Sequence, residues 1–231
     1  MPRKVIHSAG IAETALLVCR EKLRHALDSR GRASLVLSGG STPLGLYALL
    51  AGSDLPWEKI SVFWGDERFV PPEHGDSNSG AARVVLLEPA SVPETNIHPW
   101  PILGTPEESA EAYAGVLTRE LGPEPVFDLT LLGLGADGHT ASLFPRSPAL
   151  RAPGLTAADR PATTQHARLT LTTRALSSSR TVMFLVSGDD KREALQELLA
   201  GDAGTADGDA PARAITALEE LLVVTDMALR D

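Results

Sequence analysis

An acid and an imidazole stand two residues apart in Asp137-Gly138-His139, directly after an apolar run. Histidine can accept a proton near neutral pH, and a neighbouring carboxylate fixes its tautomer and raises its basicity. On a glycine-flanked turn both side chains can face one cleft. The spacing therefore predicts a general base with an acidic partner, the alternative being a histidine that only caps its turn.

Glycine and hydroxyl residues follow another apolar run, as Ser38-Gly39-Gly40-Ser41-Thr42-Pro43. Thr42 is placed to be a helix N-cap and Pro43 to be the first helical residue. Glycines let the backbone approach an anion, and a helix N-terminus offers unpaired N–H groups with a partial positive charge. The segment predicts a phosphate or carboxylate site, or else an ordinary strand–helix turn. It lacks the Gly-Lys-Ser/Thr of a P-loop.

Two cations stand at comparable places. Arg68 closes the triplet Asp66-Glu67-Arg68 after a third apolar run, where we expect partial enclosure, and its planar fork suits phosphate or carboxylate. Lys191 occupies the expected first turn of a helix, where the helix dipole disfavours a cation unless an anion binds there. A salt-bridged loop and a surface lysine are the alternatives.

Other chemistries have weaker support. Gly133, Gly135 and Gly138 fit the dinucleotide pattern Gly-x-Gly-x-x-Gly, but Pro145 and Pro148 interrupt the helix that should follow, and Asp159 has no strand before it. The chain has no His-Glu-x-x-His and no Gly-x-Ser-x-Gly, so we expect no metal and no serine nucleophile. The remaining residues that could ligate a metal or act as a nucleophile are interpreted as structural or surface groups: Cys19, His7, His25, His74, His98 and His166.

The elements that must position these residues alternate along the chain. Apolar periodicity predicts helices at 11–28 (stopped by Gly31), 78–88 and 106–121, the last with a Thr105 to Glu108 capping box. Apolar runs predict buried strands at 35–37, 60–64, 127–132, 181–186 and 221–224, and a half-exposed strand at 168–172. Segments 145–166 and 201–211 are expected to be loops. This alternation indicates an α/β fold with a mostly parallel sheet, in which ligands bind beyond the carboxyl ends of strands.

Size and charge narrow the class of protein further. The chain has 231 residues and a mass of 24.4 kDa, so we expect residues 1–231 to form one domain. The formal charge of −9 without a Lys/Arg cluster argues against nucleic-acid binding, and no apolar run is long enough for a membrane span. One cysteine and a start without a secretory signal lead us to expect a cytoplasmic protein.

Taken together, these motifs closely resemble the 6-phosphogluconolactonase family. The resemblance covers nearly the whole chain, in order and spacing, and five segments carry it: Ser38–Pro43, Trp64–Pro71, Asp76–Asn78, Gly133–Pro145 and Arg168–Thr172, the last of which precedes Gly188–Lys191. It implies a modified Rossmann-like α/β fold, shared with glucosamine-6-phosphate deaminases, and hydrolysis without a cofactor of 6-phosphoglucono-1,5-lactone in the oxidative pentose phosphate pathway.

The resemblance also implies roles for residues. His139 would activate water without a covalent intermediate, and Asp137 would orient the imidazole or contact sugar hydroxyls. The 6-phosphate would be held by Gly40, Ser41, Thr42, Arg68 and Lys191, although Arg68 could serve the oxyanion instead. Gly39, Asp66 and Arg168, which stand in the same motifs, complete the expected substrate-binding set.

Two alternatives remain open. Glucosamine-6-phosphate deaminases also carry Asp-Gly-His, but their motif continues as Ile-Ala-Phe-Asn-Glu-Pro, whereas here His139 is followed by Thr-Ala-Ser-Leu-Phe-Pro without an acid. A noncatalytic sugar-phosphate sensor would keep the phosphate residues but would not need His139. A monomer is the favoured oligomeric state, which the sequence does not decide.

Overall fold

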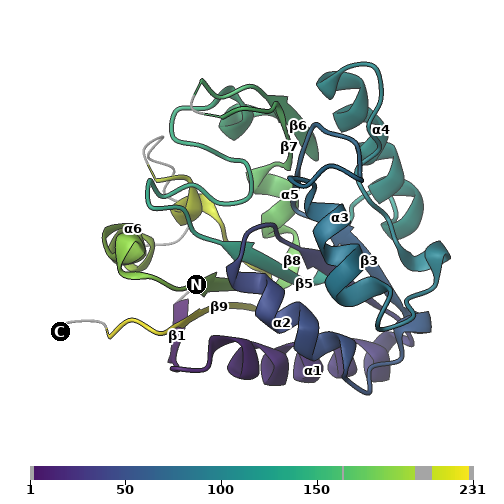
Figure 1. Ribbon diagram of the computed structural model, residues 1–231, viewed down its shortest axis with the longest axis vertical. Helices are drawn as coiled ribbons and strands as arrows, with labels where there is room; N and C mark the ends of the chain where they lie inside the picture. Colours follow the sequence, from purple (N-terminus) through teal and green to yellow (C-terminus); the bar gives the residue numbers. More distant parts are fainter. Residues whose placement is uncertain (1–2, 163, 201–209, 229–231) are drawn as a thin grey trace.

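The sheet at the centre of the molecule is entirely parallel. The computed structural model describes residues 3–162, 164–200 and 210–228, and within them six strands pair in the order β1-β9-β8-β5-β2-β3 (Figure 1). Their bounds are β1 Arg3–His7, β2 Ala33–Leu37, β3 Ile60–Trp64, β5 Phe127–Gly133, β8 Ser179–Val186 and β9 Glu220–Thr225. A second, antiparallel sheet has the order β4-β7-β6, with β4 Asp66–Arg68, β6 Thr156–Asp159 and β7 Arg168–Leu171.

Helices connect the strands and cover the sheet. They are α1 Ile11–Arg30, α2 Thr42–Ala51, α3 Asn78–Ala82, α4 Pro106–Leu121, α5 Thr173–Ser177 and α6 Arg192–Leu199. Five 3₁₀ turns (Trp57–Lys59, Glu94–Asn96, Pro148–Arg151, Asp189–Lys191, Pro211–Ala214) and one π turn (Arg83–Leu87) complete the described elements. Of the described helices, none is both long and apolar enough to cross a bilayer.

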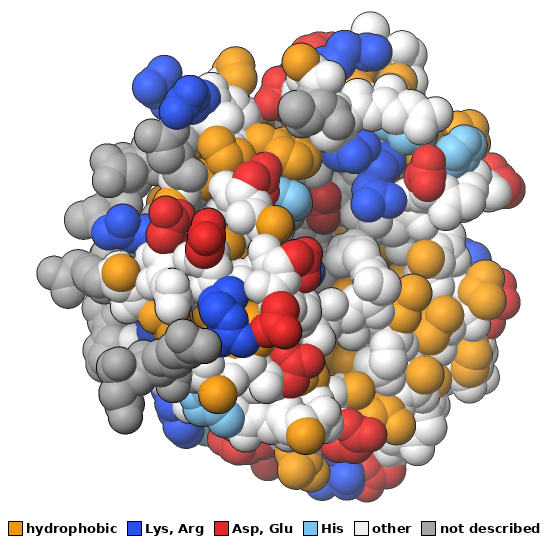
Figure 2. All heavy atoms as spheres, turned by 60° about the vertical axis from the view of Figure 1, so that its left-hand side comes forward, with side chains coloured by type: hydrophobic (Ala, Val, Ile, Leu, Met, Phe, Trp, Pro, Cys, Tyr) orange, Lys and Arg blue, Asp and Glu red, His pale blue; other side chains and the backbone are white. Residues whose placement is uncertain are grey.

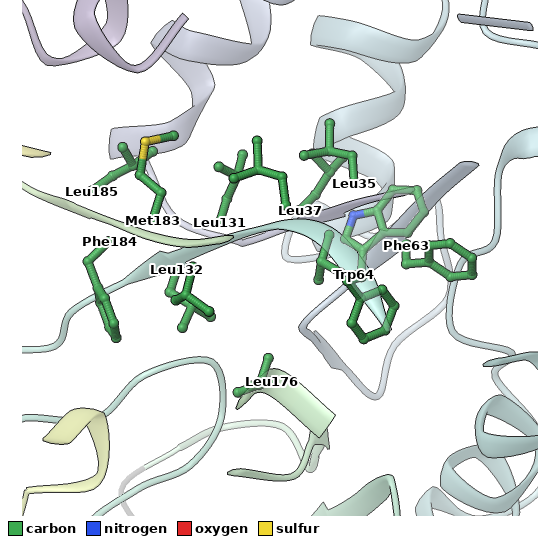
Figure 3. Close-up of a cluster of buried hydrophobic side chains, with 14 of the residues drawn as sticks. Leu35, Leu37, Phe63, Trp64, Leu131, Leu132, Leu176, Met183, Phe184 and Leu185 are labelled. Carbon is green, nitrogen blue, oxygen red and sulfur yellow. The ribbon is translucent and has the colours of Figure 1, made fainter. Parts of the chain in front are cut away.

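The core forms on both faces of the parallel sheet because its central strands are mostly apolar and are buried on both faces. Leu131 and Met183 point toward the side of α1 and α2, whereas Leu132 and Phe184 point to the opposite side, toward Leu176 of α5 (Figure 3). All five of these side chains are fully buried. Burial on both faces fixes the strand register, and with it the level at which each strand ends.

Most elements expected from the sequence are present, and the fold class is confirmed as α/β with a mostly parallel sheet. Gly31, at φ 70°, ends α1 as predicted, and Cys19 is fully buried, which raises the pKa of its thiol. No α-helix follows the glycines at 133–138 within residues 134–151, in agreement with the doubt about a dinucleotide site.

Three predictions were wrong in detail, and two strands were not expected. Strands β1 and β4 were missed because they are short and rich in charge, and segment 145–166 contains β6 and a 3₁₀ turn rather than only loop. Strand β7 is buried rather than half-exposed, because α4 contacts it as well as α5. Thr42 is the first helical residue and Ser41 holds the N-cap position. Of the loop expected at 201–211, residues 201–209 lie outside the part of the chain that the structure describes.

The capping box of α4 offers a direct check on local sequence reasoning. The Thr105 hydroxyl accepts a hydrogen bond from the Glu108 amide at 3.1 Å, and the Glu108 carboxylate accepts one from the Thr105 amide at 3.0 Å. We expect Thr105→Ala to lower the free energy of unfolding by about 1 kcal/mol in urea titrations. Thr118→Ala, on the exposed part of the same helix, should leave it within about 0.5 kcal/mol. Equal effects of the two changes would contradict the capping role.

Candidate active site

A crevice is expected where neighbouring strands of a parallel sheet connect in opposite directions. Here β2 leads to β3 on one side, while its other neighbour β5 leads to β8 and β9 on the opposite side. The segments 38–43 and 134–139 leave the carboxyl ends of β2 and β5 and therefore flank this crevice. The ends of β3 and β8 add the segments that carry Arg68 and Lys191.

A cavity of about 310 Å³ lies at this place. On the face shown in Figure 2, basic, acidic and histidine side chains lie around a hollow in the surface. The cavity is lined by Ser38, Gly39, Gly40, Ser41, Thr42, Pro43, Asp66, Arg68, Asn78, Gly133, Leu134, Gly135, His139, Ala141, Leu185 and Lys191. A larger cavity of about 610 Å³ is lined mainly by apolar side chains around α3 and the π turn, and it holds no comparable set of charged groups.

His139 and Asp137 form a close pair at the rim of the smaller cavity. Nδ1 of His139 lies 2.5 Å from Oδ1 of Asp137, which also accepts a hydrogen bond from the His139 amide at 3.2 Å. Partial burial raises the pKa of Asp137, but the hydrogen bond and the charge of His139 outweigh this, so the pKa lies below its usual value. A carboxylate at Nδ1 leaves Nε2 as the unprotonated nitrogen, which is the state that a general base requires.

The glycine turn is what permits this geometry. The Gly135 amide donates to the His139 carbonyl at 2.8 Å, and a Cβ at position 135 would overlap the His139 ring and crowd the Asp137 carboxylate. On its other side the imidazole packs against Phe144, with ring centroids 4.6 Å apart. The ring is therefore fixed by the turn, by Asp137 and by Phe144.

Polar groups of segment 38–43 face the cavity from its opposite wall. The buried Tyr47 hydroxyl holds Ser38, accepting from its amide at 2.9 Å and donating to its carbonyl at 2.7 Å. Ser41 makes no side-chain cap to the first turn of α2, so the N–H groups there keep their positive potential. Among the described residues, the Ser38 hydroxyl is one of few buried polar atoms without a hydrogen-bond partner.

Asp66 connects three segments at the floor of the site. Asp66 is buried. Its carboxylate accepts a hydrogen bond from the Ser142 hydroxyl at 2.6 Å and lies 3.4 Å from the side-chain nitrogen (Nδ2) of Asn78. Burial raises the pKa of Asp66, although Ser142 and the charge of Arg68 oppose the rise. The Asn78 side chain occupies the space where a Cβ of Gly39 would lie, which explains a glycine at that position.

Arg68 and Arg168 are directly opposite each other on the antiparallel strands β4 and β7. Burial lowers the pKa of Arg168, and the positive charge of Arg68 lowers it further. Like charges on opposing strand positions are destabilising, so this arrangement costs stability in the free protein. A bound anion with two or more charges would relieve that repulsion.

Glu67 holds the cavity wall without facing the cavity. Its buried carboxylate accepts four hydrogen bonds, from the amides of Arg68 (2.9 Å), Asn78 (2.7 Å) and Ser79 (2.8 Å) and from the Ser77 hydroxyl (3.2 Å). Burial raises the pKa of Glu67, whereas these donors favour its charged form. Glu67 thus ties β4 to the start of α3.

This network predicts a large effect on stability. Glu67→Gln replaces one acceptor oxygen by an amide that faces N–H donors, and an unsatisfied buried donor costs about 1–3 kcal/mol. We expect the free energy of unfolding in urea to fall by about 2–4 kcal/mol. Glu73→Gln, at an exposed position of the following loop, is the matched control and should change it by less than about 0.5 kcal/mol. If the free energy of unfolding falls no further than in the Glu73→Gln control, Glu67 does not connect β4 to the start of α3.

Most residues predicted from the sequence lie together here. Gly39, Gly40, Ser41, Thr42, Asp66, Arg68, His139 and Lys191 all line the cavity. Asp137 and Arg168 are not among the lining residues: Asp137 contacts His139, and Arg168 neighbours Arg68. Lys191 ends a 3₁₀ turn just before α6 and does not lie inside its first turn.

Sequence reasoning missed three groups of this site. Ser38 and Asn78 stand within segments that the motifs include, but nothing in their types marked them as lining residues. Ser142 was missed because its partner Asp66 is 76 positions away.

Comparison with known proteins agrees with this architecture. Residues 7–224 match the family described as glucosamine-6-phosphate isomerases/6-phosphogluconolactonase. A 6-phosphogluconolactonase of Synechocystis is 43% identical over 96% of this chain and 93% of its own, and one of Nostoc is 41% identical over 90% and 87%. The crystal structure of the 6-phosphogluconolactonase of Thermotoga maritima superimposes with a TM-score of 0.85 at 30% identity, covering 97% of this chain and 98% of the other.

Proposed function

The chain belongs to the family of glucosamine-6-phosphate isomerases and 6-phosphogluconolactonases, and from this membership and its site we infer the reaction and the residues that carry it out. The protein is a 6-phosphogluconolactonase: it hydrolyses 6-phospho-D-glucono-1,5-lactone to 6-phospho-D-gluconate, a step of the pentose phosphate pathway. The observation that supports this most strongly within the site is one cavity lined by His139, which is paired with Asp137, and by the cations Arg68 and Lys191.

His139 is the general base of the proposed mechanism. Its Nε2 takes a proton from water while the water oxygen attacks the lactone carbonyl carbon. The tetrahedral intermediate then breaks the ring C–O bond, and the ring oxygen takes the proton back from the imidazolium to become a hydroxyl. The new carboxylic acid releases one proton to solvent. A lactone is an activated ester, so this sequence uses no covalent nucleophile and no cofactor.

In this proposal the substrate phosphate binds at the cationic side of the cavity. Arg68 and Lys191 supply charge, Gly39, Gly40, Ser41 and Thr42 supply backbone and hydroxyl donors, and Arg168 adds to the potential from its place beside Arg68. Asp66 is suited to accept hydrogen bonds from sugar hydroxyls. Asp137 holds the imidazole, since its carboxylate is already engaged at Nδ1.

We further propose a cytoplasmic, single-domain monomer. The one cysteine is buried and forms no disulfide, which suits a compartment that keeps thiols reduced. The expected partner is the small phosphosugar lactone, without nucleic acid or membrane.

The test of the function is acid release from freshly generated 6-phosphoglucono-1,5-lactone above the spontaneous rate, with ammonium release from glucosamine 6-phosphate measured in parallel. Acceleration of the first alone is the expected result. Ammonium release alone would replace the hydrolase by a deaminase. If both rates stay at background while phosphosugars bind, the protein is a sensor.

A further inference from the structure

Three side chains that bind metals gather outside the cavity. His74 and Asp76 lie in the loop between β4 and α3, and His166 lies just before β7. Strands β4 and β7 are antiparallel neighbours, and the Phe69 amide donates to the Ala167 carbonyl at 2.9 Å just beyond their pairing. The chain leaving β4 and the chain entering β7 therefore run side by side. This places His166 next to Asp76, which is 90 positions earlier in the sequence.

The spacing of the three ligand atoms suits one metal ion. Asp76 Oδ2 lies 3.0 Å from Nε2 of His166 and 3.8 Å from Nδ1 of His74, and one ligand atom of each residue lies within 4.8 Å of the others. In a tetrahedral zinc site with bonds of roughly 2.0–2.1 Å, neighbouring ligand atoms are about 3.3 Å apart. The two distances to Asp76 bracket that value, and the two imidazole nitrogens, which lie within 4.8 Å of each other, must approach for both to bind one ion.

We propose that His74, Asp76 and His166 form a binding site for a divalent transition metal, with zinc as the ion and water as the fourth ligand. Two imidazoles with one carboxylate favour zinc over magnesium or calcium, which prefer oxygen ligands. The His74 and Asp76 side chains are 44% and 51% exposed, so an ion can enter from solvent. The His166 side chain, at 19%, closes the inner side.

Hydrogen bonds to the main chain hold the segments that carry the ligands. The Asp76 amide donates to Nδ1 of His74 at 3.1 Å, so this nitrogen is an acceptor, and a metal that binds it must displace that hydrogen bond. The Asp76 carbonyl accepts from the Arg68 guanidinium at 2.6 Å, and the His166 carbonyl accepts from Arg168 at 3.3 Å. These bonds fix both ligand-bearing segments to the two arginines.

The same arginines limit the affinity. Asp76 is the one carboxylate of the set, and it already faces the positive charges of Arg68 and Arg168. A dication at this place is repelled by both guanidinium groups. We therefore expect a dissociation constant in the micromolar range, and not the nanomolar binding of closed structural sites.

The test is a calorimetric titration of the full chain with zinc chloride. The wild-type protein is expected to bind one equivalent, and His74→Gln and His166→Gln should each weaken binding by about 30-fold or more. His25→Gln, at an exposed histidine of α1, is the matched control and should bind as the wild type does. Excess magnesium should not compete.

Three results would overturn the proposal: no heat of binding in the wild type, equal affinity in the His166→Gln and His25→Gln variants, or displacement of zinc by magnesium. Thermal unfolding without metal establishes that the variants are folded. The titration requires no substrate, so its outcome is independent of the hydrolase assignment.

Discussion

Replacing His139 by asparagine is expected to lower kcat for lactone hydrolysis by about 10²–10⁴-fold, the usual contribution of a positioned general base. Asparagine keeps a polar side chain of similar reach but cannot accept a proton from water. The substrate phosphate is held by other groups in our proposal, so KM should change little. The measurement is the initial rate of acid release from 6-phosphoglucono-1,5-lactone, corrected for spontaneous hydrolysis.

The matched control is His7→Asn. His7 is an exposed residue of β1, and strands β9 and β8 separate β1 from β5 in the sheet. It should retain the wild-type rate. Turnover of the His139→Asn protein within about threefold of wild type would remove His139 from the mechanism. A rise in KM with unchanged kcat would instead make it a binding residue.

The sequence predicted the parts of the site that depend on single strands. A buried parallel strand has an apolar signature and ends in a glycine-bearing turn, so segments 38–43 and 134–139 could be placed at strand ends without knowledge of their neighbours. Their convergence also followed, since the carboxyl ends of parallel strands share one edge. The His139–Asp137 contact needed only local spacing.

The parts that depend on the small antiparallel sheet could not be found in this way. Strands β4 and β6 are three and four residues long and mostly charged or small, so they carry too little periodicity to be recognised. Without them nothing in the sequence places Arg168 opposite Arg68, or His166 beside Asp76. This is why the histidines at 74 and 166 were interpreted as isolated groups, whereas the structure gives both of them Asp76 as a neighbour.

Arg68→Ala is expected to raise KM for the phosphorylated lactone by about 10- to 150-fold, which corresponds to loss of a charged hydrogen bond of about 1.5–3 kcal/mol. With unphosphorylated glucono-1,5-lactone the same change should have little effect, because no group of that substrate requires the guanidinium. The two substrates thus separate phosphate binding from chemistry. Lys191→Ala should show the same selectivity.

Arg83→Ala is the matched control, because Arg83 is exposed and pairs with Glu94 on the surface at 2.6 Å. The alternative role of Arg68 at the oxyanion makes a different prediction: kcat would fall on both substrates to a similar extent, as expected when an interaction exists only in the transition state. Arg68 also donates to the Asp76 carbonyl, so the unfolding temperature of the variant must be measured alongside. A loss of kcat on both substrates in a folded Arg68→Ala protein would move Arg68 from the phosphate to the reacting carbonyl, and would leave Lys191 and the 38–43 segment to bind the phosphate.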